Sequence, residues 1–303
     1  MNVDPTRNMV VFLLARGEGE HGIADVATLD EDGIRQAWER VAREHRARPD
    51  EVVALHSEWA ATETDLAFVG AVFPDAKLTH NFDRPGPDGW EQAFQAAAQV
   101  MAQAQGQQLA EEAADRMAHA EQNGELLPVL WSASSPNAST MLAAMPHWSL
   151  VPGRLFVGLA MVAPTPRGTI GMSHLTHDAH QRIGSPALGD LIGQASESLA
   201  RGLRVDGRRS DRGDLLAMHR EGSLAASALA LPDFYERMSE TLNDERLVVG
   251  LPCPDDLIVA GANSGWPEEI RRMVLESTYP TTELVPSVLL VDRAGIQLLA
   301  ERS

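Results

Sequence analysis

Residues 10–82 alternate between short apolar runs and segments with helical periodicity, and this alternation constrains the fold more than any other sequence feature. Ile34, Trp38 and Val41 recur at the spacing that places them on one face of an amphipathic helix. Strands are predicted at residues 10–15, 52–55 and 77–82, and helices at 30–44 and 62–73. Strands separated by helices predict an α/β first domain with a mixed sheet of three or more strands.

The chain has 303 residues, enough for two domains. Residues 90–123 are rich in Ala, Gln and Met and predict one long helix, in which Gly106 is the candidate break. Asn123 and Gly124 close this helix. We therefore assign residues 1–123 to the α/β domain and residues 124–303 to a second domain.

The second domain mixes strand and helix signals without regular alternation, which predicts an α+β fold. One expected hairpin turns at Asp206 and Gly207. The other elements are a strand at 154–162, helices at 173–183, 185–203 and 268–277, strands on each side of 252–256, and a terminal hairpin over 287–299.

The charge balance limits the classes of partner. The chain carries 43 acidic and 25 basic residues, a net charge of -18. A surface this negative repels phosphate backbones and anionic lipids, so neither nucleic acid nor a membrane is an expected partner. Residues 1–150 hold 23 of the acidic residues but only 10 of the basic ones. The first domain is therefore the acidic one. A protein partner is expected, and the charge favours a basic partner or serves simple solubility.

Cys253 is the only cysteine, which excludes an internal disulfide and a multi-cysteine metal site. The apolar run at 10–15 is too short for a secretory leader or a membrane span. We expect a cytoplasmic protein without a bound cofactor. The glycine pattern at Gly17, Gly19 and Gly22 resembles a dinucleotide-binding loop, but its two glutamates oppose phosphate, so a connecting loop is expected.

Two clusters could bind a ligand. His174, His177 and His180 lie three residues apart with Asp178 beside them, so a solvated helix is expected, with a metal site through His174 and His177 as the alternative. Five guanidinium groups fall within twelve residues and could bind an anion or a partner, although interleaved aspartates favour a salt-bridged hairpin. These groups belong to Arg201, Arg204, Arg208, Arg209 and Arg212.

Residues 52–82 resemble the second half of the bacterial toxin-type nucleic-acid deaminases. The resemblance rests on a strand ending in Ser57 and Glu58, a helix, and a following strand introduced by Phe73 and Pro74. In that family two cysteines open the helix and hold zinc. The corresponding positions here fall near Thr62 and Asp65, so the resemblance implies a metal-free, inactive copy.

Residues 124–303 resemble the YtpQ-like family of bacterial proteins, which has no established activity. The resemblance rests on apolar segments that recur in order and on a turn between two strands, here Pro252 to Asp255. They include 126–129, 155–162, 175–203, 221–232 and 247–258. We expect Asp255 to form the turn by bonding its own backbone rather than to act in catalysis.

The sequence favours a non-enzymatic protein-binding protein, and analogy with the deaminase-like toxins suggests an immunity or accessory role in a bacterial conflict system. Two alternatives remain. One is an enzyme such as a metal-dependent hydrolase that uses the region of His174 and His177. The other is a small-anion binder that uses the arginine cluster.

Overall fold

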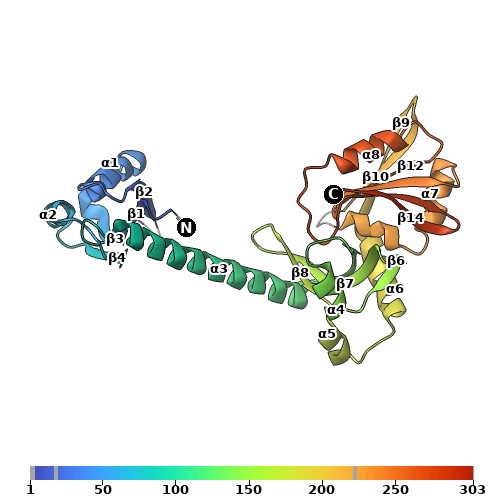
Figure 1. Ribbon diagram of the computed structural model, residues 1–303, viewed down its shortest axis with the longest axis horizontal. Helices are drawn as coiled ribbons and strands as arrows, with labels where there is room; N and C mark the ends of the chain where they lie inside the picture. The colour runs from blue at the N-terminus through green and yellow to red at the C-terminus, as the bar shows by residue number, and fades with distance from the viewer. Residues whose placement is uncertain (1–3, 17–19, 221–223, 303) are drawn as a thin grey trace. The chain divides into compact units, whose positions relative to one another are not determined.

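The computed structural model describes residues 4–16, 20–220 and 224–302. The chain divides into two compact units, Met1–Glu112 and Ala113–Ser303, and the division falls inside the long helix α3 (Trp90–Asn123). The first unit is an α/β structure and the second is α+β, which confirms the predicted fold class (Figure 1).

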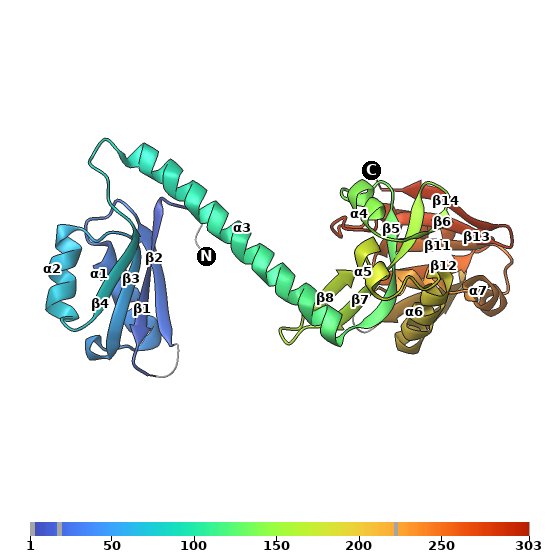
Figure 2. The ribbon, with the colours of Figure 1, turned by 90° about the horizontal axis from the view of Figure 1, so that it is seen from below.

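A mixed four-stranded sheet, ordered β2-β1-β3-β4, forms the centre of the first unit. β1 pairs antiparallel with β2 and β3, whereas β3 and β4 are parallel. Figure 2 shows α1 and α2 on the same side of this sheet. The elements are β1 (Arg7–Leu14), β2 (His21–Ala27), α1 (Gly33–His45), the 3-10 turn η1 (Pro49–Glu51), β3 (Val52–Trp59), α2 (Glu63–Val72) and β4 (Lys77–Phe82).

The core of the first unit lies between the two helices and this face of the sheet. Ile34, Trp38 and Val41 are buried there, as their spacing predicts, against Phe12 and Phe73. Strand β2 was not predicted. Its buried residues include Gly22, Ala24 and Val26, which alternate with exposed positions.

Helix α3 is continuous, so the break expected at Gly106 is wrong. Gly106 is surrounded by Ala, Gln and Glu, and one glycine costs a helix only about 1 kcal/mol. In the first unit, Trp90 and Phe94 pack their rings against Trp59 at 5.3 and 5.6 Å between centroids.

The second unit contains two sheets. An antiparallel sheet of six strands has the order β14-β13-β11-β12-β10-β9. In the other sheet β5, β6 and β8 all pair with β7. The elements that form the two sheets are β5 (Glu125–Ser132), β6 (Trp148–Val151), β7 (Leu155–Pro164), β8 (Ile170–His174), β9 (Leu203–Ser210), β10 (Gly213–Arg220), β11 (Leu247–Cys253), β12 (Asp256–Gly261), β13 (Ser287–Asp292) and β14 (Gly295–Glu301).

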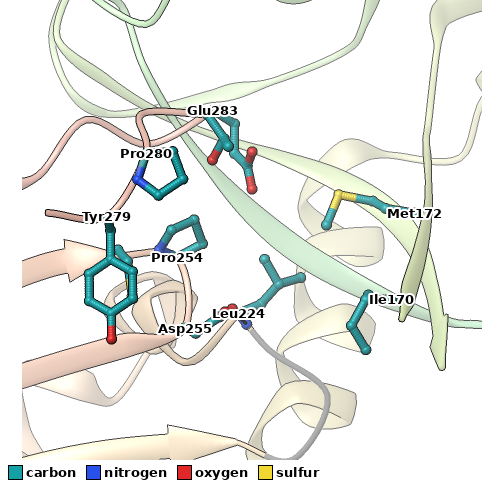
Figure 3. Close-up of a pocket in the computed structure, with 10 residues that line it drawn as sticks. Ile170, Met172, Leu224, Pro254, Asp255, Tyr279, Pro280 and Glu283 are labelled. Carbon is teal, nitrogen blue, oxygen red and sulfur yellow. Dashed lines mark hydrogen bonds between the residues drawn. The ribbon is translucent and has the colours of Figure 1, made fainter. Parts of the chain in front are cut away.

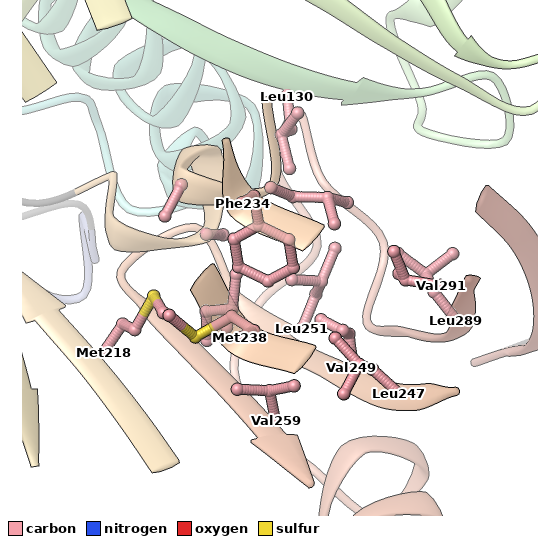
Figure 4. Close-up of a cluster of buried hydrophobic side chains, with 14 of the residues drawn as sticks. Leu130, Met218, Phe234, Met238, Leu247, Val249, Leu251, Val259, Leu289 and Val291 are labelled. Atoms are coloured by element: carbon pink, nitrogen blue, oxygen red, sulfur yellow. The ribbon is translucent and has the colours of Figure 1, made fainter. Parts of the chain in front are cut away.

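Helices cover both faces of the six-stranded sheet. On one face, Ile270 and Val274 of α8 pack on Val248. On the other, Phe234 and Met238 of α7 pack on residues of β11, β12 and β13 (Figure 4). The helical elements are α4 (Ala138–Ala144), α5 (His177–Arg182), α6 (Leu188–Gly202), the 3-10 turn η2 (Ala225–Ala230), α7 (Phe234–Leu242) and α8 (Pro267–Leu275).

Two local expectations for this unit are wrong. The helix expected over 173–183 is the end of strand β8 followed by short helix α5, because the Thr176 hydroxyl accepts the Ala179 N–H and caps a new helix. The β9–β10 hairpin turns at Asp211 and Arg212 instead of Asp206 and Gly207. Its register pairs Ser210 with Gly213, whose φ of 102° suits the end of the turn.

Candidate functional site

The arginine cluster occupies the last turn of α6 and strand β9, the last strand on one side of the six-stranded sheet among the described residues. All six residues from Arg204 to Arg209 are exposed, on both faces of the strand. Arg201, one position before the end of α6, donates a hydrogen bond to the Ser198 hydroxyl at 2.9 Å. The sequence thus correctly placed these guanidinium groups on or next to a hairpin.

The arginines of this hairpin differ in their partners. Arg209 forms a bidentate pair with Asp214, at 2.8 and 2.9 Å, which lowers the pKa of that carboxyl. Arg208 and Arg212 both lie over the ring of Trp266, at 5.7 and 5.5 Å from its centroid. An anion that binds at this hairpin would therefore contact Arg208, which is stacked on the Trp266 ring, and Arg209, whose charge Asp214 already neutralises.

The opposite face of β9 carries Val205, Gly207 and Arg209. Val205 is 47% exposed there, and it borders a small crevice of about 70 Å³. The crevice is lined by Leu203, Met218 and Phe234, among others. Since alternate residues of a strand face opposite sides, β9 presents Arg204 and Arg208 on one face and Val205 on the other.

Asp255 lies on the rim of a cavity of about 310 Å³ in the second unit (Figure 3). Its carboxylate accepts the N–H of Leu224 at 3.0 Å, and Leu224 has a left-handed backbone with φ of 70°. The expectation that Asp255 bonds its own backbone is therefore wrong. Asp255 does occupy the β11–β12 turn, but it fastens that turn to the start of η2.

Cys253 also lines this cavity and is 5% exposed. Burial raises the pKa of its thiol to about 11, and the neighbouring Asp256 and Asp255 carboxylates add to this effect. A thiol with this pKa is protonated at neutral pH, so Cys253 lacks the property that a nucleophilic cysteine needs.

The structure separates the histidines. His174 ends β8, and its ring packs edge-on against Trp131 at 5.3 Å. Its buried Nδ1 has no hydrogen-bond partner in the described part of the chain, and burial lowers the pKa of the ring. His177 is the exposed first residue of α5, and His180 bonds the Pro186 carbonyl at 2.8 Å. His177 and His180 therefore share α5, whereas His174 lies on strand β8, so the three histidines do not lie on one helix as the sequence suggested.

In the first unit, the positions that match the deaminase cysteines belong to a buried hydrogen-bond network between α1 and α2. The Thr62 hydroxyl accepts the Asp65 N–H at 3.0 Å and donates to the Glu31 carbonyl at 2.5 Å. Asp65 is 1% exposed, and its carboxylate accepts the Ile34 N–H at 3.0 Å. Glu58 is also buried and accepts the Met9 N–H at 3.2 Å. These groups hold the unit together.

The buried carboxyl of Asp65 should make the stability of the first unit depend on pH. Burial raises its pKa above 3.8, so the folded state binds a proton more readily than the unfolded state, and stability falls as pH rises from that value through the folded pKa. We expect Asp65→Asn to lose less stability than the wild type between pH 4 and 7, measured by urea unfolding. Asp75→Asn, at an exposed position, is the control and should match the wild type. Equal pH dependence in all three proteins would contradict this expectation.

Three other observations concern the sequence predictions. Residues 17–19 of the glycine pattern lie outside the described residues, as do 221–223 of the YtpQ-like pattern. Within the described ranges, no group of three or more His, Cys, Asp or Glu side chains could hold a metal ion. Among the helices of those ranges, none combines the length and the apolar character needed to cross a bilayer.

Comparisons with known proteins give no relative: the chain matches no family model, no curated protein and no solved structure.

Proposed function

We propose that this is a non-enzymatic protein-binding protein, and that the edge strand β9 of its second unit pairs with an extended, acidic segment of a partner. One observation carries the proposal: β9 is exposed from Arg204 to Arg209 and is the last strand of its sheet in the described structure. An edge strand directs part of its N–H and C=O groups outward, where another extended chain can pair with them.

The side chains of β9 indicate what that segment contains. Arg204 and Arg208 lie on one side of β9 with Asp206 between them, and they would face two residues of an added strand that are four positions apart, which favours Asp or Glu at both. Val205 and the crevice beside it would face the intervening residues, which favours apolar side chains. The proposed segment therefore alternates acidic and apolar residues, because the local arginines of β9 favour acidic groups although the net charge of the whole chain favours a basic partner.

The arrangement of the candidate residues supports binding over catalysis. Asp255 lies on the rim of one cavity, His174 is not among the described residues that line it, and Arg204, Arg208 and Arg209 lie on strand β9. The anion-binding alternative is less favoured because Asp214 already neutralises Arg209. In its specific form, the proposal is a cytoplasmic immunity or accessory role in a bacterial conflict system, which rests on the deaminase resemblance.

A labelled peptide in which Asp and Val alternate tests the proposal by fluorescence anisotropy with the full chain. We expect it to bind, and the double variant Arg204→Glu/Arg208→Glu to bind at least about tenfold more weakly, because two attractive charges become repulsive. Arg293→Glu is the matched control, since Arg293 is exposed at the β13–β14 turn, away from β9 in the order of strands.

Two further peptides check the mechanism. A Lys–Val peptide should not bind, and a peptide with methylated backbone nitrogens should bind poorly because it cannot complete the strand pairing. Equal binding of the Asp–Val and Lys–Val peptides, or unchanged affinity in the double variant, would refute the proposal. Circular dichroism confirms that each variant is folded.

A further inference from the structure

The cavity beside Asp255 lies apart from strand β9, and its lining points to a different kind of ligand. It lies between strand β8, the β11–β12 turn and the segment 279–283, and its volume is about 310 Å³. Most of its lining is apolar, with Ile170, Met172, Leu224, Pro254 and Pro280 forming the walls (Figure 3). A space of this size and character can hold a small ligand or one long side chain.

One carboxylate, that of Glu283, borders this apolar cavity. Glu283 is half-buried, and Figure 3 shows its carboxylate directed into the space between Pro280 and Met172. In the described structure, no hydrogen bond or ion pair involves its side chain. Among the described residues that line the cavity, Arg and Lys are absent. An ionised carboxylate in such surroundings is stabilised by a cation.

The backbone around Glu283 is firmly held. Its carbonyl accepts the Ser132 N–H at 2.9 Å, and two residues later the Val285 N–H donates to the Ser132 hydroxyl at 3.0 Å. Leu284 and Val285 are both buried. These contacts to the end of β5 fix the position of the carboxylate before any ligand arrives.

Neighbouring groups do not neutralise Glu283. His174, at the end of β8, interacts electrostatically with Glu283, but burial lowers the pKa of its imidazole below the usual 6.5, which favours the uncharged ring at neutral pH. Asp255, from the β11–β12 turn, adds a second negative charge at the rim, where its carboxylate is held by the Leu224 N–H. The cavity therefore combines negative charge with hydrocarbon walls.

From the cavity and its unpaired carboxylate, we infer that the second unit binds an alkylammonium group. The ammonium lies at Glu283 with Asp255 nearby, and the hydrocarbon chain lies on Ile170, Met172 and Leu224. A bare metal ion would gain nothing from these apolar walls, whereas an organic cation uses both parts of the cavity. The group comes either from a free small amine or from a lysine side chain of another protein.

Isothermal titration calorimetry of the full chain with n-butylammonium, n-butanol and butyrate tests the inference. We expect n-butylammonium to bind and the other two, which lack the positive charge, to bind at least about tenfold more weakly. Glu283→Gln, which keeps the shape of the side chain, should weaken n-butylammonium binding by about tenfold or more. Glu240→Gln, at an exposed position of α7, is the matched control and should leave it unchanged.

A second variant tests the cavity independently of the charge. Ile170→Trp narrows the space and leaves both carboxylates in place, so it should also weaken binding of n-butylammonium. Titration with a blocked lysine peptide separates the two sources: tighter binding than n-butylammonium indicates a lysine side chain, and weaker binding indicates a free amine. Binding of n-butanol as strong as that of n-butylammonium, or full affinity in Glu283→Gln, would overturn the inference.

Discussion

Replacing Trp59 by alanine should unfold much of the first unit while leaving the second intact. Trp59 is 1% exposed, and its ring contacts Phe82, Trp90 and Phe94. Its indole N–H also donates to the Pro5 carbonyl at 3.1 Å. Loss of a buried aromatic side chain costs about 3–5 kcal/mol, a large part of the stability of one domain.

Hydrogen exchange followed by mass spectrometry measures this effect separately in each unit. Amides of β1 and β3 should exchange much faster in Trp59→Ala, whereas amides of β11 and β13 should keep their wild-type rates. Trp148→Ala is the matched control, because Trp148 is 57% exposed on β6 and should cost little. Unchanged protection of β1 and β3 in Trp59→Ala would show that the aromatic cluster does not hold this unit together.

A large loss of stability is also expected from Gly124→Ala, at the junction of α3 and β5. A Cβ atom there would lie 2.5 Å from the Ala120 carbonyl oxygen and 2.8 Å from the Val162 nitrogen. These are backbone atoms of a helix and of a buried strand, so they cannot rotate away as a side chain can. We expect the second unit to lose about 2 kcal/mol or more in urea unfolding.

Gly106→Ala, inside helix α3, provides the contrasting control. An added Cβ at Gly106 meets no atom within 4 Å, so alanine should stabilise α3 by about 0.5–1 kcal/mol. Both substitutions replace glycine by alanine, but they should change the free energy of unfolding in opposite directions. Equal effects would mean that the close backbone approach at Gly124 does not matter.

Much of the fold could be predicted because large apolar side chains recur at clear periods. Ile34, Trp38 and Val41 specify the buried face of α1, and the apolar run of β1 specifies a buried strand. Strand β2 escaped prediction because small side chains occupy two of its inward positions, Gly22 and Ala24, which give a weak hydrophobic signal. The β9–β10 turn was misplaced because Asp206 and Gly207 are typical turn residues that here lie within a strand.

The candidate sites were less predictable because they form through tertiary contacts. Asp255 was singled out by its turn, but its bond to Leu224 joins residues 31 positions apart. Glu283 belongs to no sequence motif, and it reaches the cavity only because its segment is fastened to Ser132, which is far away in sequence. The arginines of β9 were found because their signal is local and compositional.

Because of its environment, the rate at which the Cys253 thiol reacts depends on local motion in the second unit. Its side chain lies on the cavity wall at the end of β11, and both burial and a high pKa suppress its reaction with electrophiles. Alkylation therefore requires a local opening of the structure around Cys253 that lets the reagent and water reach the sulfur. Since Cys253 is the only cysteine of the chain, the rate at which the protein is alkylated measures how often the structure opens around this one side chain.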